Sequence, residues 1–258
     1  MSTQIIERMA VEIDGAGDAL VMLHGLGGTS NVWSPQMPAL APRLRTIRPD
    51  LPGAGRSPAA ASVSIQTLVD AVVRLCGVLG IARAHFAGHS MGTIVCQHLA
   101  VQHPSLVQSL ALIGPLPAPP DAGRQGLRDR AAKVRTEGMS EVAAALLQAA
   151  TSADTRTNQP VAAAFVRELL MRQDPEGYAK LSEALAAAEA ADLAQVRCRA
   201  LLVTGDEDQI APPSSVRAMA GMMQDARVAV FNRCGHWTTI ERANEVSAEL
   251  REFYFGRR

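Results

Sequence analysis

The chain has 258 residues, 48% of them hydrophobic, and 25 basic side chains balance 25 acidic ones, so its formal net charge is +0. This length and composition favour one domain with a single large hydrophobic core. The balanced charge argues against nucleic acid or an anionic membrane as a partner, so we expect a small-molecule partner.

The N-terminal stretch Met1–Asp14 lacks the basic start and apolar run of a secretion signal. No segment approaches the roughly 20 apolar residues that span a bilayer, so we expect a cytoplasmic protein without a membrane partner. Within this stretch, Gln4–Met9 and Ala10–Asp14 predict an edge hairpin that closes before Gly15.

Short apolar runs farther along are typical of strands buried on both faces of a parallel sheet. They are Ala19–Leu23, Thr46–Arg48, Ala84–Ala87, Leu110–Ile113, Ala200–Val203 and Val228–Phe231. Segments with apolar residues at helical spacing alternate with them, most clearly from Ile65 to Leu79 and from Val246 to Phe253. This alternation predicts an α/β fold with a mostly parallel central sheet, helices on both faces, and ligands at the carboxyl ends of the strands.

The alternation stops between Pro115 and Asp192, where Ala-rich helical segments occur without a strand pattern. The clearest of these helices are Met139–Ala150, Val161–Arg172 and Tyr178–Ala190. We therefore predict a helical cap at residues 115–192, inserted into a core made of residues 1–114 and 193–258.

The sequence Gly88-His89-Ser90-Met91-Gly92 stands between a predicted strand and a predicted helix. In a G-x-S-x-G turn of this kind, the serine lies on a tight elbow beside the N–H groups and partial positive charge of a helix N-terminus. The same pattern arises by chance in loops, but the strand before it and the helix after it favour Ser90 as a nucleophile.

A serine hydroxyl needs a base, and the candidates are His24, His85, His89, His98, His103 and His236. His236 follows the run Val228–Phe231 and precedes the last helix, where the base of such a fold is needed. His85 lies within a predicted strand, and His98 and His103 lie on the predicted helix after Ser90, so packing or surface roles are favoured for them. His89 is next to Ser90, but adjacent side chains on an elbow point apart. We therefore assign the base to His236.

The base in turn needs an orienting carboxylate at a strand end, between the serine and the histidine in the chain. The loop after Ala200–Val203 contains Asp206, Glu207 and Asp208, whereas the run that ends at Ile113 is followed by no acid. Position alone leaves these three acids as alternatives.

Two N–H groups are needed to stabilise an oxyanion, and one is expected from Met91, directly after the nucleophile. The other is expected from Leu26 in the glycine-rich loop His24-Gly25-Leu26-Gly27-Gly28. We assign His24 mainly to holding this loop by hydrogen bonds, with a substrate contact as the alternative.

The chain resembles the α/β-hydrolase fold superfamily over essentially its whole length. The matching segments are His24–Gly27, Asp50–Ser57, Gly88–Gly92, Gly205–Asp208 and Gly235-His236. In that family the second aspartate of the G-D-x-D segment is the triad acid, so the resemblance selects Asp208. It also implies that the Asp50–Ser57 loop lines one side of the site and has a structural role.

Within the superfamily, the cap sequence Arg130–Met139 is similar to the 3-oxoadipate enol-lactonases. The overall pattern also resembles small carboxylesterases and N-acyl-homoserine lactonases. The candidate substrate-binding residues are His24, Trp33, Arg124, Arg128, Arg135 and Trp237. The three arginines share a helical face that suits a substrate carboxylate, and a solvated arginine face is the alternative.

Together these residues predict hydrolysis of a small ester or lactone through an acyl-enzyme, without an organic cofactor. The four cysteines are scattered without the spacing of a zinc site, so we expect no metal. Serine at position 90 argues against the dehalogenases and epoxide hydrolases that this pattern resembles, which use an aspartate nucleophile. The alternatives that retain serine are cofactor-free haloperoxidase or perhydrolase activity, hydroxynitrile lyase activity, acyl transfer, carbon–carbon bond hydrolysis and a non-enzymatic small-ligand receptor.

Overall fold

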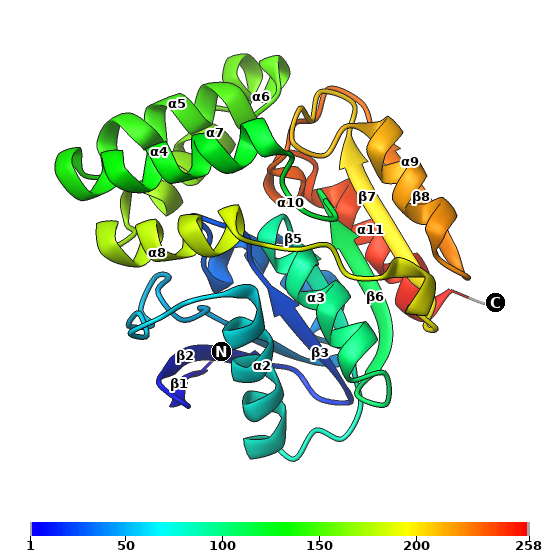
Figure 1. The fold of residues 1–258 in the computed structure, drawn as a ribbon. Coiled ribbons are helices and arrows are strands. Elements are labelled where there is room, and N and C mark those ends of the chain that lie inside the picture. The colour runs from blue at the N-terminus through cyan, green and yellow to red at the C-terminus, as the bar shows by residue number, and fades with distance from the viewer. Residues whose placement is uncertain (1, 257–258) are drawn as a thin grey trace.

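Eight strands form one sheet in the computed structural model, which describes residues 2–256. In chain order they are β1 Ser2–Ile6, β2 Met9–Asp14, β3 Asp18–Leu23, β4 Leu44–Pro49, β5 Ala84–His89, β6 Val107–Ile113, β7 Ala200–Gly205 and β8 Ala226–Phe231. Across the sheet the order is β1-β2-β4-β3-β5-β6-β7-β8 (Figure 1). Only the pairs β1–β2 and β2–β4 are antiparallel in this described sheet, which confirms the predicted mostly parallel arrangement.

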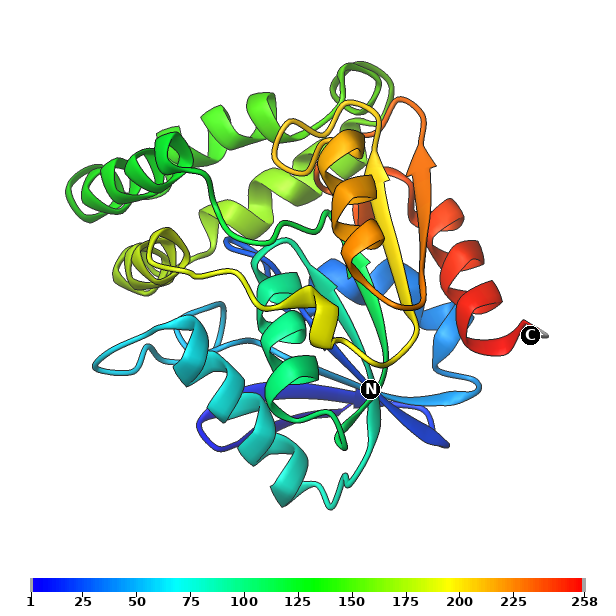
Figure 2. The same ribbon diagram turned by 45° about the vertical axis from the view of Figure 1, so that its right-hand side comes forward.

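Helices cover both faces of the sheet, as Figures 1 and 2 show. One face carries α2 Ile65–Val78, α3 Met91–Gln102 and α9 Pro213–Met222. The other face carries η1 Ser30–Gln36, α1 Met37–Leu40 and α11 Ala243–Phe255. The short helices η2 Leu193–Gln195 and α10 Thr238–Glu241 lie in connecting segments. Across residues 2–256, no helix is both long enough and apolar enough to cross a membrane.

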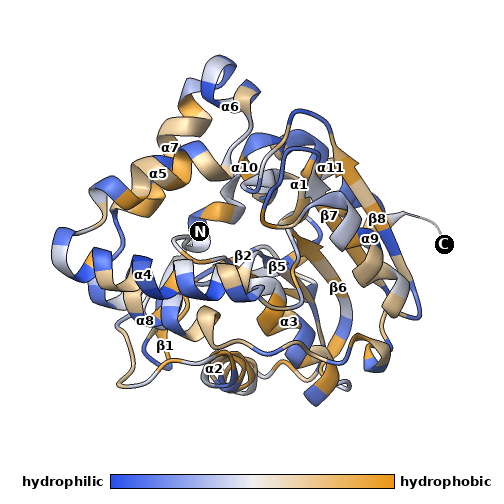
Figure 3. Ribbon diagram, turned by 45° about the horizontal axis from the view of Figure 1, so that its top comes forward, coloured by the Kyte–Doolittle hydropathy of each residue, from blue (hydrophilic) through white to orange (hydrophobic). Residues whose placement is uncertain are grey.

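The central strands are buried on both sides, as strand β6 illustrates. Leu110 and Leu112 pack with α2 and α3, whereas Ala111 and Ile113 pack in the cluster that contains α1 and α11. Successive residues of a strand point to opposite faces, so this continuous apolar run fills two cores at once. Figure 3 shows hydrophobic colour on β6 and hydrophilic colour along much of the outer helix α4 Asp121–Glu137.

The predicted N-terminal hairpin is present, but its turn is earlier than expected. Ile6 pairs with Met9, so Glu7 and Arg8 form the turn in place of the break between Met9 and Ala10. Both turn residues have positive φ, 49° and 65°, as a two-residue hairpin loop requires. The sequence lacks the Asn-Gly or Asp-Gly pair that normally marks such a turn, which explains the shifted prediction.

Five α-helices lie between β6 and β7 in the described chain, and Figures 1 and 2 place them over the carboxyl ends of the strands. We call them the cap segment: α4 Asp121–Glu137, α5 Ser140–Ala150, α6 Ala153–Asn158, α7 Pro160–Met171 and α8 Pro175–Ala186. The division of the chain into core residues 1–114 and 193–258 and cap residues 115–192 stays a prediction.

Helix α8 differs from its predicted bounds, Tyr178–Ala190, at both ends. It begins at Pro175, because the Asp174 side chain accepts a hydrogen bond from the Gly177 N–H at 2.7 Å and proline suits the first turn. It ends at Ala186, four residues earlier than expected. Residues 187–199, which contain only the short helix η2, therefore connect α8 to β7.

We expect Phe86→Ala to lower the free energy of unfolding by about 3 to 5 kcal/mol, because Phe86 on β5 is 0% exposed and its loss leaves a cavity. Urea unfolding measures this effect. The matched control is Val78→Ala, at a side chain that is 61% exposed on α2, which should change stability by less than about 0.5 kcal/mol. Equal effects of the two changes would contradict the assigned core.

Candidate active site

Ser90 occupies a strained turn between β5 and α3. Its φ of 52° and ψ of −119° lie outside the regions that serine normally adopts. Gly92 permits this path, because a Cβ there would lie 2.5 Å from the Leu23 carbonyl oxygen. The turn directs the Ser90 side chain to the carboxyl edge of the sheet, at the wall of a pocket.

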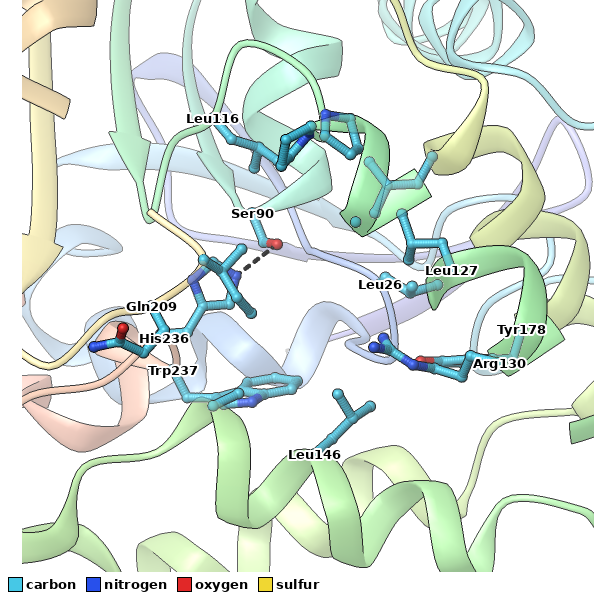
Figure 4. Close-up of a pocket in the computed structure, with 16 residues that line it drawn as sticks. Leu26, Ser90, Leu116, Leu127, Arg130, Leu146, Tyr178, Gln209, His236 and Trp237 are labelled. Carbon is cyan, nitrogen blue, oxygen red and sulfur yellow. Dashed lines mark hydrogen bonds between the residues drawn. The ribbon is translucent and has the colours of Figure 1, made fainter. Parts of the chain in front are cut away.

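A chain of two hydrogen bonds joins Ser90 to residues that follow β8 and β7. His236 Nε2 lies 2.7 Å from Ser90 Oγ (Figure 4). On the other side of the ring, His236 Nδ1 lies 2.8 Å from Asp208 Oδ2. All three residues are buried, with Ser90 the most exposed at 9%. The structure thus brings Ser90 together with two side chains, Asp208 and His236, that lie more than a hundred residues later in the sequence.

The three acids after β7 have different partners. Asp206 Oδ1 accepts a hydrogen bond from the Cys234 N–H, and Glu207 Oε2 accepts one from the Ala153 N–H. Asp208 alone among these three reaches the imidazole of His236. Asp206 and Glu207 therefore tie loops together, and the geometry separates them from Asp208.

The Asp208 carboxylate is held in its ionised form. Burial by itself raises its pKa, but the interaction with His236 and the N–H groups of Ala211 and Ile210 outweigh burial. The pKa of Asp208 consequently lies below its ordinary value of 3.8. An ionised carboxylate only accepts hydrogen bonds, so His236 Nδ1 is the donor in this contact. In the neutral form of the ring, Nε2 is then the nitrogen that can accept a hydrogen bond from Ser90.

The loop after β3 packs directly against the turn that holds Ser90. A Cβ at Gly25 would lie 2.7 Å from Ser90 Cβ, so glycine is needed for this close approach. Leu26 lines the same pocket as Ser90, and Met91 is the first residue of α3. Both residues thus lie close to Ser90, and their role as the two N–H donors of an oxyanion site stays a prediction.

His24 is fully buried and holds the loop, as its main assignment predicted. Its Nε2 accepts a hydrogen bond from the Leu51 N–H at 2.9 Å, and its Nδ1 lies 2.8 Å from the Gly25 oxygen. It is not among the residues that line the pocket, so the structure does not place it for substrate contact.

The Asp50–Ser57 loop is organised around one carboxylate. Asp50 accepts hydrogen bonds from the Ser30 N–H at 2.8 Å and from Arg56 Nε at 2.9 Å. Burial raises the pKa of Asp50, but these bonds to Arg56 and Ser30 outweigh burial and hold it below its ordinary value of 3.8. The resemblance implied that this loop lines one side of the site, but none of its residues lines the pocket that contains Ser90.

His89 has a role that its sequence position alone did not reveal. Burial, together with the nearby His236, lowers the pKa of His89 to about 3, so the ring is neutral near pH 7. Its Nε2 lies 2.8 Å from the backbone oxygen of His236 and donates to it. His89 therefore holds the backbone of the residue whose side chain faces Ser90.

A pocket of about 260 Å³ lies between the strand ends and the cap segment. Its lining is mostly apolar, and the larger apolar side chains are Leu26, Leu116, Leu127, Leu146, Leu185, Ile210 and Trp237. Ser90 and His236 form part of the wall, and Figure 4 shows Arg130 and Tyr178 on the far side of the cavity from His236. A small, largely apolar molecule with one polar end fits such a lining.

The structure places Trp237 in the pocket wall but excludes Trp33, which is 0% exposed in the core with α1 and α11. The three predicted arginines also lie elsewhere. Arg124 donates to the Ala186 oxygen, Arg128 is exposed, and Arg135 forms ion pairs with Glu176 and Glu183. Arg128 and Arg135 are exposed, as the alternative interpretation of a solvated face expected, whereas Arg124 is partly buried against α8.

Arg130 is the cap arginine that lines the pocket, and it is not among the arginines predicted to bind the substrate. It lies three residues after the buried Leu127 and next to the buried Ala131, so helical periodicity places it at the edge of the inward face of α4. Among the described lining residues it is the only permanent charge. Burial raises the pKa of the Tyr178 hydroxyl, and the charge of Arg130 beside it partly opposes that shift.

The described residues contain no cluster of three or more His, Cys, Asp or Glu side chains suited to a metal ion. The cysteines Cys76, Cys96, Cys198 and Cys234 are free thiols. The polar side chains that line the pocket include Ser90, His236, Gln209, Arg130 and Tyr178.

Comparison with known proteins adds independent information. Residues 18–243 match the family model described as alpha/beta hydrolase fold. The 2-hydroxymuconate semialdehyde hydrolase of Pseudomonas sp. (strain CF600) is 32% identical over 259 residues, which cover 93% of this chain and 87% of the relative. The solved enol-lactonase from Burkholderia xenovorans LB400 is 30% identical with a TM-score of 0.91, over 98% of this chain and 99% of that one. A malate-bound thermophilic esterase from Thermogutta terrifontis is 26% identical with a TM-score of 0.91, over 95% and 92% of the two chains.

We expect Asp50→Asn to lower the free energy of unfolding by about 2 kcal/mol near pH 7, because it removes a charged acceptor of buried hydrogen bonds. The folded-state pKa of Asp50 is depressed, so its stabilisation is present above pH 3.8 and is lost as the pH falls through the folded value. Urea unfolding across this range should show the difference from wild type shrinking at acid pH.

The control is Asp129→Asn, at an exposed carboxyl on α4, with an expected change below about 0.5 kcal/mol. A difference for Asp50→Asn that does not vary with pH would show that the charge is not responsible.

Proposed function

The chain belongs to the alpha/beta hydrolase fold family, and from this premise we propose that it hydrolyses a carboxylic ester or lactone through Ser90, His236 and Asp208. The observation that carries this proposal is the hydrogen-bond chain from Ser90 Oγ to His236 and on to Asp208, at the wall of the pocket. The esterase and enol-lactonase among its structural neighbours support the choice of substrate class.

In the proposed reaction, His236 Nε2 takes the proton of Ser90 as Ser90 Oγ attacks the carbonyl carbon. The 2.7 Å contact between these two atoms is within the range for proton transfer. Asp208 keeps the Nδ1 proton in place and stabilises the imidazolium that forms. The leaving alkoxide then receives the proton from His236, and an acyl-enzyme remains.

The N–H groups of Leu26 and Met91 are proposed to stabilise the oxyanion. Met91 stands at the N-terminus of α3, whose partial positive charge favours negative charge at this point. The close contact of Gly25 with Ser90 brings the Leu26 loop to the same place. Water activated by His236 then attacks the acyl-enzyme and releases the acid.

The pocket lining suggests which esters or lactones are preferred. Most of the wall is apolar, but Arg130 supplies a positive charge in a partly buried position. Within residues 2–256 no carboxylate forms an ion pair with Arg130, unlike Arg124 and Arg135. We therefore favour a small substrate whose acyl part ends in a carboxylate, as in an enol-lactone of a dicarboxylic acid.

Ser90→Ala should reduce the kcat for ester hydrolysis by about 10⁴-fold or more and abolish labelling by a fluorophosphonate, because the nucleophile is gone. Turnover of p-nitrophenyl esters measures the first effect, and mass spectrometry measures the second. Ser214→Ala, at an exposed serine on α9, is the control and should behave as wild type. Hydrolysis by Ser90→Ala at the wild-type rate would refute the proposal.

Arg130→Met should lower kcat/KM for carboxylate-bearing esters, such as mono-p-nitrophenyl glutarate, by about 10- to 100-fold, because a charge-assisted contact is lost. For p-nitrophenyl butyrate, which has no charge, we expect a change within about 3-fold. Arg128→Met removes an exposed charge from the same helix and should leave both substrates unaffected. Equal losses for the charged and neutral esters would argue against a carboxylate contact.

The same assay extends to a panel of lactones and related compounds. It includes p-nitrophenyl esters of increasing length, an N-acyl-homoserine lactone, 3-oxoadipate enol-lactone and 2-hydroxymuconate semialdehyde. Selective turnover of one compound identifies the branch of the family to which the activity belongs.

A further inference from the structure

A buried carboxylate lies outside the pocket and makes four hydrogen bonds. Glu241, the last residue of α10, is 2% exposed and does not line the pocket. Its oxygens accept from the N–H groups of Gly235 at 3.1 Å and Trp237 at 3.0 Å. They also accept from the Ser152 N–H at 2.7 Å and the Thr155 hydroxyl at 2.8 Å.

Two of these donors are the neighbours of His236 on either side. Peptide N–H groups can only donate, so Glu241 fixes the N–H groups of the residues before and after His236. The backbone N–H and oxygen of His236 itself have different partners: the N–H donates to the Ala150 oxygen at 2.9 Å, and the oxygen accepts from His89. The backbone around the histidine is thus held by hydrogen bonds at each successive residue.

The other two donors belong to the cap segment, at the junction of α5 and α6. This junction touches the histidine loop backbone to backbone, since a Cβ at Gly235 would lie 2.7 Å from the Ser152 nitrogen. One oxygen, Glu241 Oε2, accepts from Gly235, Ser152 and Thr155 together. A displacement of the junction would therefore reach the histidine loop through this atom, in addition to the hydrogen bond from the His236 N–H to the Ala150 oxygen.

We propose that Glu241 is a positioning residue that aims the His236 imidazole at Ser90 and couples that aim to the cap segment. This inference rests on the proposed role of His236 as the base. A misplacement of about 1 Å can cost about 100-fold in rate, so a residue that contacts neither substrate nor the reacting atoms can still limit turnover.

The first test is Glu241→Gln, which keeps the shape but turns an NH₂ group toward at least one N–H donor. We expect kcat for p-nitrophenyl butyrate to fall by about 10- to 100-fold while KM stays within about 2-fold, because Glu241 does not line the pocket. Fluorophosphonate labelling of Ser90 should slow by the same factor and still reach one label per chain. A role in folding alone would instead lower the labelled fraction and leave the rate per active chain unchanged, which would overturn the proposal.

The second test uses the cap side of the same carboxylate and also applies if Glu241→Gln fails to fold. Thr155→Val removes one donor to Glu241 and should lower kcat by about 3- to 10-fold. Its control is Thr136→Val, at an exposed threonine on α4 whose hydroxyl contacts only its own helix, with no expected change. In the Glu241→Gln background, Thr155→Val should add less than about 2-fold, because both changes act through one contact. Fully additive effects, or wild-type kcat for Thr155→Val, would overturn the coupling to the cap.

A third measurement does not depend on catalysis and so separates this inference from the proposed function. Amide hydrogen exchange at Gly235 and Trp237 should be slow in the wild type and faster in Glu241→Gln, whether or not Ser90 is the nucleophile. If Ser90→Ala keeps full activity, the proposed function fails and the role of Glu241 in aiming a catalytic base fails with it. If Ser90→Ala is inactive but both exchange and kcat are unchanged in Glu241→Gln, the inference about Glu241 alone is wrong.

Discussion

The backbone conformation of Ser90 is the constraint on which the rest of the site depends. A serine with φ of 52° is strained by about 1 to 3 kcal/mol, so the conformation persists only because the surrounding structure enforces it. The end of β5 and the start of α3 fix the chain on both sides, and Gly92 and Gly25 allow the β3 end and its loop to approach closely. The parallel sheet then brings the loops after β7 and β8 to the same edge, where His236 meets the serine.

The core and the cap segment make different contributions to the site. The loops at the strand ends provide the hydrogen-bonded serine, histidine and aspartate, which have strict geometric requirements. The cap provides much of the apolar wall, including Leu127 and Leu146, and the charge of Arg130. Because much of the pocket wall is built on helices outside the sheet, the cap sequence can change the shape of the pocket while the hydrogen-bonded serine, histidine and aspartate stay in place.

The sequence predicted those parts that depend on local patterns. Apolar runs located six of the strands, and the G-x-S-x-G turn located Ser90, because strand burial and the elbow leave a continuous local signature. The other two strands were predicted as a hairpin, but its turn lies earlier than expected. Features decided by contacts between distant segments were not readable in this way. Asp206, Glu207 and Asp208 differ only in their remote partners Cys234, Ala153 and His236, and family resemblance was needed to choose among them. The prediction that cap arginines contact the substrate chose the wrong residues for a related reason. A rotation of α4 by part of a turn decides whether Arg130 or Arg124 faces the pocket.

The contact between α4 and α8 also bears on how the chain folds. Strand β6 ends at Ile113 and its partner β7 begins at Ala200, and closing a flexible loop of that length costs about 2 kcal/mol more than closing one of about ten residues. The cap segment closes on itself near both of its ends, where Arg124 donates to the Ala186 oxygen and the Ser182 hydroxyl donates to the Leu127 oxygen. Once α4 and α8 pair, only residues 114–120 and 187–199 connect the paired helices to the two strands. The inserted helices thus reduce the entropic barrier that their own length would impose on the pairing of β6 with β7.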